Sequence, residues 1–242
     1  MTIDEKAISF CRRLIPAIYA DIKTHTRRVI IPQPILSDMD KYRSDGIWDN
    51  EDSGDGLLYV ERLDNKGEPT EDYRAIGRPR YVPGDILWVK EEYYEYGRWT
   101  VDGNTKTGKL KTRFVSMPYE EYGQPIYYAD TLPPDVKVCK NKANIGYFWR
   151  NSRFMPRRVA RLYLKITAIR AERLTDITEA DAIAEGFKPT YRESDGFRIM
   201  SARNNFMETW DKLNKKRGFG TFVNPYVFVY GLQRIKDKVK DI

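Results

Sequence analysis

The sequence has only two cysteines and one histidine among its 242 residues. Cys11 and Cys139 lie far apart, which argues against a disulfide framework and fits a reducing compartment. One histidine and two cysteines also supply too few ligands for a zinc site. We therefore expect a cytoplasmic protein that needs no metal.

Long apolar runs are also missing, since none approaches the ~18 residues that a membrane-spanning helix needs. The N-terminal sequence MTIDEKAISF is mixed and acidic, without the basic and then apolar order of a signal peptide. A glycine-rich phosphate loop is absent, because Lys215–Gly220 matches neither the Walker nor the dinucleotide pattern. We expect no membrane partner and no cofactor.

Hydrophobic residues make up 41% and aromatic residues 13% of the chain, enough for a sizeable core in one large or two small domains. The formal net charge of +7 is compatible with nucleic acid as a partner. The charge is uneven, because 38–72 is rich in Asp and Glu while 150–173 is basic. The basic residues are Arg150, Arg153, Arg157, Arg158, Arg161, Lys165, Arg170 and Arg173. They fit either phosphate contacts beside Tyr and Trp or a solvated strand exterior.

The segment from Lys23 to Arg28 reads KTHTRR and puts two hydroxyls, an amine, the only histidine and two guanidinium groups into six residues. Threonine hydroxyls alternating with cations suit a polar or anionic ligand, because Thr donates and accepts while Arg offers a planar fork. A basic surface strand is the other interpretation of this hexad.

The apolar spacing predicts a helix over 5–22, with Pro16 either weakening it or opening a second short helix. Strands are expected at 29–31, 56–61, after the Pro83–Gly84 turn, at 125–130, over 158–174 and at 225–232. Helices are expected after Thr178, which has Asp181 at the capping-box offset, and over 202–214, with Phe206, Trp210 and Leu213 on one side. Turn-rich 38–77 and 93–148 are interpreted as insertions. Strands do not alternate regularly with helices, so we predict an α+β fold with a small barrel or bent sheet.

Several segments resemble the ASCH domains (activating-signal-cointegrator homology) of the PUA-like superfamily. They are KTHTRR after an N-terminal helix, PGDILWV at 83–89, WRNSRFMPR at 149–157, LTDITEADAIAEG at 174–186 and the closing NPYVFV at 224–229. The resemblance covers about half the chain and is strongest to ASCH-like proteins of phages and prophages, which are often labelled morphogenetic. It implies one domain over 1–242, a small β-barrel with flanking helices and two insertions.

The resemblance also suggests an activity, because a bacterial ASCH protein that hydrolyses N(4)-acetylcytidine uses a Lys-Thr-Glu set. Its lysine and threonine match Lys23 and Thr26, and its glutamate matches Glu185. In that hypothesis Thr26 is the nucleophile, Lys23 the base and Glu185 an orienting acid or base, with Arg27 and Arg28 lowering the pKa of Lys23 and Arg28 positioning the ligand. Residues three apart on a strand point to opposite faces, so Lys23 must lie in the turn before the strand.

Simpler roles remain for the same residues, since Glu185 could pair with Arg27, Thr26 could bond a strand edge and His25 could be a surface residue. Three functions follow from these observations. The first is a domain that binds RNA, a nucleobase or a modified nucleoside in a basic cleft, with Arg27, Arg28, Arg150, Arg153 and Arg157 as ligand contacts. The second is an amidohydrolase acting on acylated cytidine, and the third is a phage assembly protein. Weak ribonuclease activity is a variant of the first.

Overall fold

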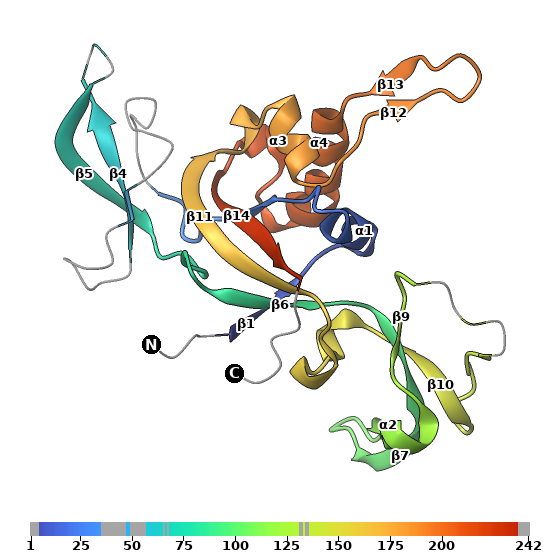
Figure 1. Cartoon of the computed structure of the whole chain (residues 1–242). Helices are drawn as coiled ribbons and strands as arrows, with labels where there is room; N and C mark the ends of the chain where they lie inside the picture. The colour runs from blue at the N-terminus through green and yellow to red at the C-terminus, as the bar shows by residue number, and fades with distance from the viewer. Residues whose placement is uncertain are drawn as a thin grey trace. The chain divides into compact units, whose positions relative to one another are not determined.

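The computed structural model describes residues 5–34, 47–48, 57–64, 66, 68–130, 133 and 136–236 (Figure 1). The described chain is a mixed α+β protein in which strands predominate, in agreement with the predicted class. It forms two compact units. Unit 1 contains Met1–Lys6, Ala17–Leu87 and Leu164–Ile242, and unit 2 contains Ala7–Pro16 and Trp88–Tyr163.

The largest sheet has five strands and an open order in the described chain. In spatial order they are β1 (Glu5–Ser9), β6 (Ile86–Lys90), β11 (Tyr163–Arg173), β14 (Tyr226–Ile235) and β2 (His25–Val29). The Pro83–Gly84 turn leads into β6 as predicted, with Gly84 at a φ of 95° that favours glycine. Figure 1 shows β11 and β14 as long, curved neighbours.

The start of the chain corrects one prediction, because the helix expected over 5–22 begins as strand β1. A 3₁₀ turn at Arg12–Leu14 follows, and only α1 (Ile15–Tyr19) is α-helical, with Pro16 in its first turn. The apolar positions at helical spacing all lie between Phe10 and Ile22. Residues 5–9 carry no such spacing, and pairing with β6 determines their conformation.

Strand β11 carries the alternation that its sequence predicts, with Leu164 and Ile166 buried and Lys165 and Thr167 exposed. Strand β14 is buried along almost its whole length, since Tyr226 to Leu232 are all buried. These two strands therefore supply a large part of the unit 1 core. The strand expected at 29–31 lies earlier in the chain, because β2 contains the last four residues of KTHTRR and ends at Val29. It is in antiparallel register with β14 from Val29–Val227 to His25–Gly231.

Two predicted helices lie together in unit 1 (Figure 1). Helix α3 (Glu179–Ala184) has the predicted capping box, and α4 (Ala202–Asn214) has the predicted bounds. Phe206 and Trp210 are buried as expected. Leu213 is exposed instead, because the buried stripe of α4 continues from Trp210 to Asn214.

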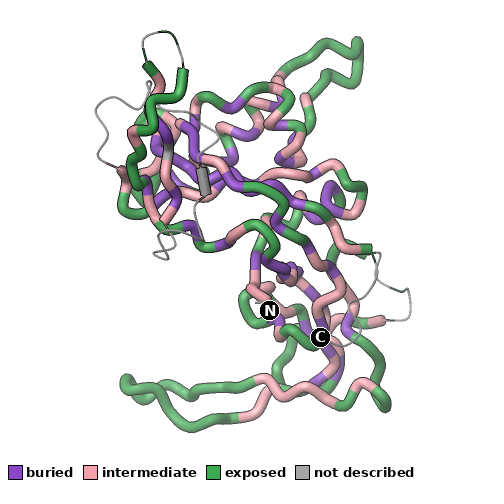
Figure 2. Tube along the Cα trace, turned by 60° about the vertical axis from the view of Figure 1, so that its left-hand side comes forward, coloured by how far each residue is buried: buried purple, intermediate pink, exposed green. Residues whose placement is uncertain are grey.

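Unit 2 is built on a second antiparallel sheet, whose strands are β10 (Ile145–Arg150), β7 (Tyr93–Asn104) and β8 (Leu110–Ser116), with β9 (Ile126–Tyr127) also pairing with β7. Gly97 is needed in β7, since a Cβ there would lie 2.5 Å from the Phe114 ring. One face of the sheet packs on the unit 2 core, with Tyr93, Met155 and Val159 buried together. The far end of the β7–β8 hairpin, 101–113, is exposed (Figure 2).

Smaller elements complete the fold. They are strands β3 (Ile47–Trp48), β4 (Leu58–Leu63), β5 (Pro69–Gly77), β12 (Thr190–Tyr191) and β13 (Arg198–Met200), helix α2 (Tyr119–Tyr122), and 3₁₀ turns at Ser152–Phe154, Arg157–Val159, Leu174–Asp176, Lys215–Arg217 and Thr221–Val223. The hairpin strand expected at 56–61 is present as β4, paired with β5. Much of the first predicted insertion, at 38–46 and 49–56, lies outside the described residues. The second, 93–148, lies within unit 2. In the described chain no helix is long and apolar enough to cross a membrane.

Candidate functional site

The ammonium group of Lys23 lies at the free edge of β2, in the turn between α1 and that strand. The Leu232 N–H donates to the Thr24 carbonyl, so the carbonyl of the next residue, His25, faces away from β14. Lys23 Nζ donates to this His25 carbonyl at 2.7 Å, to the Glu185 carbonyl at 2.9 Å and to Glu185 Oε2 at 2.7 Å. These three acceptors match the three protons of an ammonium group.

Hydrogen bonds that cap both ends of helix α3 hold Glu185 next to Lys23. At its start, the Thr178 hydroxyl accepts from the Asp181 N–H while the Asp181 carboxylate accepts from the Thr178 N–H, a capping box. At its end, Phe187 N–H bonds the Ala182 carbonyl and Gly186, at a φ of 91°, bonds the Ile183 carbonyl, which is the Schellman pattern. Glu185 is the residue just before this glycine, so the local sequence fixes its position.

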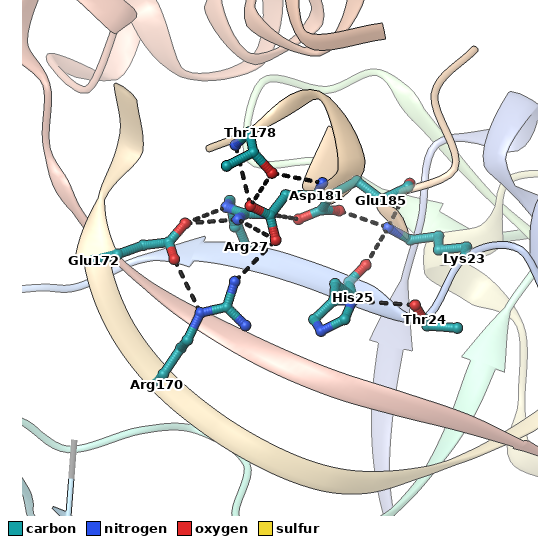
Figure 3. Close-up of polar contacts among 9 residues, drawn as sticks. All are labelled: Lys23, Thr24, His25, Arg27, Arg170, Glu172, Thr178, Asp181 and Glu185. Carbon is teal, nitrogen blue, oxygen red and sulfur yellow. Dashed lines mark hydrogen bonds and ion pairs between the residues drawn. The ribbon is translucent and has the colours of Figure 1, made fainter. Parts of the chain in front are cut away.

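Arg27 connects Glu185 to a second carboxylate, that of Glu172 on strand β11 (Figure 3). Its guanidinium group donates to Glu172 Oε1 at 2.6 and 2.8 Å and to Glu185 Oε1 at 3.3 Å. Arg170 lies beyond Glu172, with Nε 3.0 Å from Glu172 Oε2 and a second nitrogen 3.1 Å from Asp181 Oδ1. We give the name β2–α3 cluster to the set made up of Lys23, His25, Arg27, Arg170, Glu172, Asp181 and Glu185.

The charges of the β2–α3 cluster cancel. Three cations (Lys23, Arg27, Arg170) face three carboxylates (Glu172, Asp181, Glu185). Removing a single member would leave a buried charge uncompensated, which typically costs 3–5 kcal/mol. The Lys23 and Arg27 side chains are fully buried, whereas those of Arg170 and Asp181 are 28% and 22% exposed. A ligand would therefore meet the Arg170, Asp181 and His25 side of the cluster.

Burial determines the direction of two pKa shifts here. Burial lowers the pKa of Lys23 from its usual value, and the Glu185 carboxylate opposes that shift. Burial also lowers the pKa of His25, with the Arg170 cation adding to the effect, so the imidazole is neutral at pH 7. Its Nδ1 lies 3.1 Å from the Thr24 hydroxyl. Burial raises the pKa of Asp181, but Thr178, Arg27 and Arg170 outweigh it and bring the value to about 2.

The predicted site residues of unit 1 divide between two sides of β2. Lys23, Arg27 and Glu185 meet in the β2–α3 cluster, and the Arg27–Glu185 pair considered from the sequence is present. Thr26 and Arg28 alternate with Arg27 along the regular ladder, so their side chains lie on the opposite face. There Arg28 is near two tyrosines.

Those tyrosines are Tyr81 and Tyr230, whose rings meet edge to face at 5.4 Å. Burial raises the pKa of both, that of Tyr230 to about 12, while the Arg28 charge acts in the lowering direction. Thr26, the predicted nucleophile, is buried on this same face. Of the predicted Lys-Thr-Glu set, Lys23 and Glu185 are therefore in contact, whereas Thr26 lies on the other side of β2.

The other predicted ligand contacts lie in unit 2. Arg150 ends β10, and its guanidinium carbon lies 4.2 Å from the Phe114 ring centre and 5.4 Å from that of Trp99. Its side chain is only 15% exposed and its Nε is 3.8 Å from Glu95. Arg153 and Arg157 are exposed, each in a 3₁₀ turn. The three arginines therefore do not form one exposed row.

Three members of the cluster were not assigned a site role from the sequence. Asp181 was identified only as a helix cap, Arg170 only as part of a basic run, and Glu172 not at all. The available signal was near the end of β11, where a glutamate directly follows the buried Ala171 and precedes the buried Leu174 by two positions. A buried carboxylate needs a cation, and Arg170, two positions earlier, is one of its partners.

Within the described residues, no group of three or more His, Cys, Asp or Glu side chains could hold a metal ion. Comparisons with protein-family models, curated proteins and solved structures found no match to the chain.

Proposed function

We propose that the chain binds a nucleoside, free or within RNA, through its base at the exposed side of the β2–α3 cluster. The observation that carries the proposal is a charge-neutral set of fixed donors and acceptors, buried at Lys23 and Glu185 and partly exposed at Arg170 and Asp181. A cluster with no net charge favours a neutral ligand over a phosphate. A carboxylate accepts from an exocyclic amine such as cytosine N4, and a guanidinium donates to base oxygens and ring nitrogens.

The finer architecture belongs to the same proposal. We propose that the five-stranded sheet corresponds to the PUA-like barrel of an ASCH domain. The positions of three motifs support this correspondence. They are KTHTRR, which runs into edge strand β2, the Pro83–Gly84 turn before β6, and the helix that ends at Glu185. These three of the five motifs that suggested the family thus lie in unit 1, whereas WRNSRFMPR lies in unit 2.

Amide hydrolysis of an N(4)-acylated cytidine is a second candidate, favoured by the burial that lowers the Lys23 pKa next to a carboxylate. In that reaction the Thr26 hydroxyl would add to the acyl carbon, Lys23 would take its proton, and the C–N bond would break with a proton returned to N4. Water would then release the acyl group from Thr26 as a carboxylic acid. Two observations oppose this mechanism: Thr26 lies on the other side of β2 from the Lys23–Glu185 pair, and the three acceptors around Lys23 favour its ammonium form.

A calorimetric titration with cytidine, uridine, adenosine and N(4)-acetylcytidine tests the binding proposal. The double variant Lys23→Met with Glu185→Gln removes both charges together, so no buried charge is left alone. We expect about 10-fold weaker binding or more. The matched control is Lys6→Met with Asp85→Asn, a unit 1 lysine–carboxylate pair 2.8 Å apart outside the cluster, and it should keep wild-type affinity.

Equal affinity of the two double variants would reject the site. Incubation with N(4)-acetylcytidine separates the two candidates, since only hydrolysis releases cytidine. Release by wild type and its loss in Thr26→Ala would establish the enzyme, whereas binding without release supports the binding function.

A further inference from the structure

Unit 2 carries the excess positive charge of the chain. It has 16 Lys and Arg against 8 Asp and Glu, a net charge of +8, which leaves −1 for unit 1 out of the total of +7. Unit 2 also has 16 of the 32 aromatic residues in about a third of the length. Positive charge together with aromatic rings is the composition of surfaces that bind single-stranded nucleic acid.

The aromatic residues of the second sheet lie on both of its faces. Strand β7 places Tyr93 and Glu95 on the core face, so Tyr94 and Tyr96 lie on the other. The β10 register pairs Trp149 with Tyr94 and Tyr147 with Tyr96. The solvent side of an antiparallel sheet normally carries polar side chains, so rings there call for a partner.

Two rows of rings cross this face, and we call them together the aromatic face. In the first, Tyr128 stacks on Tyr94 at 5.9 Å, and Tyr94 is paired with Trp149. In the second, Tyr122 stacks on Tyr96 at 5.0 Å, and Tyr147 meets Tyr96 edge to face at 5.2 Å. The outer rings stay accessible, with Trp149 44%, Tyr122 40% and Tyr128 38% exposed.

Cations stand at both ends of the aromatic face. The Arg12 guanidinium lies 4.5 Å from the centre of the Tyr128 ring. Arg98 is exposed and shares the face, because it follows Tyr94 and Tyr96 at strand spacing. Rows two residues apart on a strand are separated by roughly 6.7 Å, which leaves room for one unstacked base at each row.

We propose that the aromatic face binds single-stranded RNA, with bases stacked on the outer rings and phosphates held by Arg12 and Arg98. Five of the six rings are tyrosines, whose hydroxyls can bond a ribose 2′-OH in addition to stacking. The aromatic face shares no residue with the β2–α3 cluster, and all of its rings except Trp149 lie outside the segments that resemble ASCH domains. Either proposal can therefore fail without the other.

Fluorescence anisotropy with a labelled 12-nucleotide oligouridine tests this surface. Trp149→Ala and Tyr128→Ala should each weaken binding by about 5- to 100-fold, the usual loss per stacked base. Trp149→Phe keeps a ring and should stay within about threefold of wild type. The matched controls are Val101→Ala on the same strand β7 and Phe222→Ala, an exposed ring of unit 1, and both should bind as wild type.

Two comparisons decide the kind of ligand. Oligouridine should bind more tightly than oligothymidine of the same length and than duplex RNA. Tighter binding of oligothymidine or of the duplex would overturn the proposal, as would wild-type affinity in Trp149→Ala or no oligouridine binding at 50 mM salt. In the Lys23→Met, Glu185→Gln background, Trp149→Ala should still weaken oligouridine binding by the same factor, which separates this result from the nucleoside test.

Discussion

His25 is the only histidine of the chain, and it stands at the partly exposed side of the β2–α3 cluster. Its imidazole is half-buried, near the Arg170 cation and the Glu185 and Asp181 carboxylates. Burial and the Arg170 charge act in the same direction and lower its pKa below 6.5. A neutral imidazole beside Thr24 can both donate and accept a hydrogen bond, as the edge of a nucleobase requires.

We expect the His25 pKa to respond to single charges in the cluster. Arg170→Gln should raise it toward 6.5, whereas Glu185→Gln should lower it further, because the carboxylate favours the protonated ring. With one histidine, the imidazole proton resonances in an NMR titration report this residue without assignment. Arg192→Gln, an exposed arginine paired with Asp195, is the control and should leave the pKa unchanged. An unchanged value in Arg170→Gln would refute the electrostatic coupling.

The sign of the stability effect follows from the same shift. The folded pKa of His25 lies below the unfolded value of 6.5, so the unfolded chain binds the proton more readily. The contribution of the neutral ring is complete above pH 6.5 and is lost as the pH falls through the folded pKa. His25→Gln should therefore flatten the fall in unfolding free energy below pH 6.5.

Helix α3 is the element that decides where Glu185 lies. It has only six residues, too few for intrinsic helix propensity to stabilise it, so its caps and packing carry it. Its last carbonyls are bound by groups from the turn before β2, namely the Thr24 N–H and the Lys23 ammonium. The negative end of the helix dipole thus faces a cation.

Thr178→Ala should lower the free energy of unfolding by about 0.5–2 kcal/mol, the usual effect of losing an N-cap, measured by urea denaturation at pH 7. Thr178→Ser keeps the hydroxyl and is the matched control. The folded pKa of Asp181, about 2, lies below the ordinary 3.8, so its stabilisation is complete above about pH 4 and is lost as the pH falls toward 2. The difference in unfolding free energy between wild type and Thr178→Ala should therefore become smaller as the pH falls from about 4 toward 2. Equal stability of the alanine and serine variants would contradict the capping role.

Helices with their own end signals were predictable from the sequence. The capping box, the glycine after Glu185 and the apolar stripe of α4 all lie within a few residues of the elements they define. Residues 5–9 were not predictable, since their strand conformation depends on pairing with β6, some 80 residues away. A pairing partner at that distance leaves no local pattern in the chain.

The candidate site was predictable in part, for the same reason. Lys23 and Glu185 were named because they lie in recognisable motifs, and the structure brings them to 2.7 Å. The division of Thr26 and Arg28 from Arg27 follows from the β2 register, which the hexad alone does not determine. The contact between Glu172 and Arg27 was not predictable, because the two residues lie 145 positions apart.

At the scale of the whole chain, charge and chemistry are divided between the two units. Unit 1 holds the neutral β2–α3 cluster, and unit 2 holds the +8 excess with the aromatic face. Attraction to a phosphate backbone releases counterions and weakens steeply with salt, whereas binding of a neutral nucleoside releases almost none. The two proposed activities should therefore differ in their response to ionic strength.

We expect oligouridine affinity to fall by about 7-fold between 50 and 200 mM salt if Arg12 and Arg98 each contact one phosphate, from a slope of ~0.7 per contact on single strands. Cytidine affinity should change less than about twofold over the same range. Arg98→Gln and Arg12→Gln should each reduce the oligouridine slope by ~0.7, while Lys212→Gln, on the exposed side of α4 and paired with Glu208, should not. A steep salt dependence for cytidine would show that net positive charge binds it, which the balanced cluster cannot supply. An oligouridine affinity that does not change with salt would show that Arg12 and Arg98 do not contact phosphates, so that only ring stacking would bind the RNA.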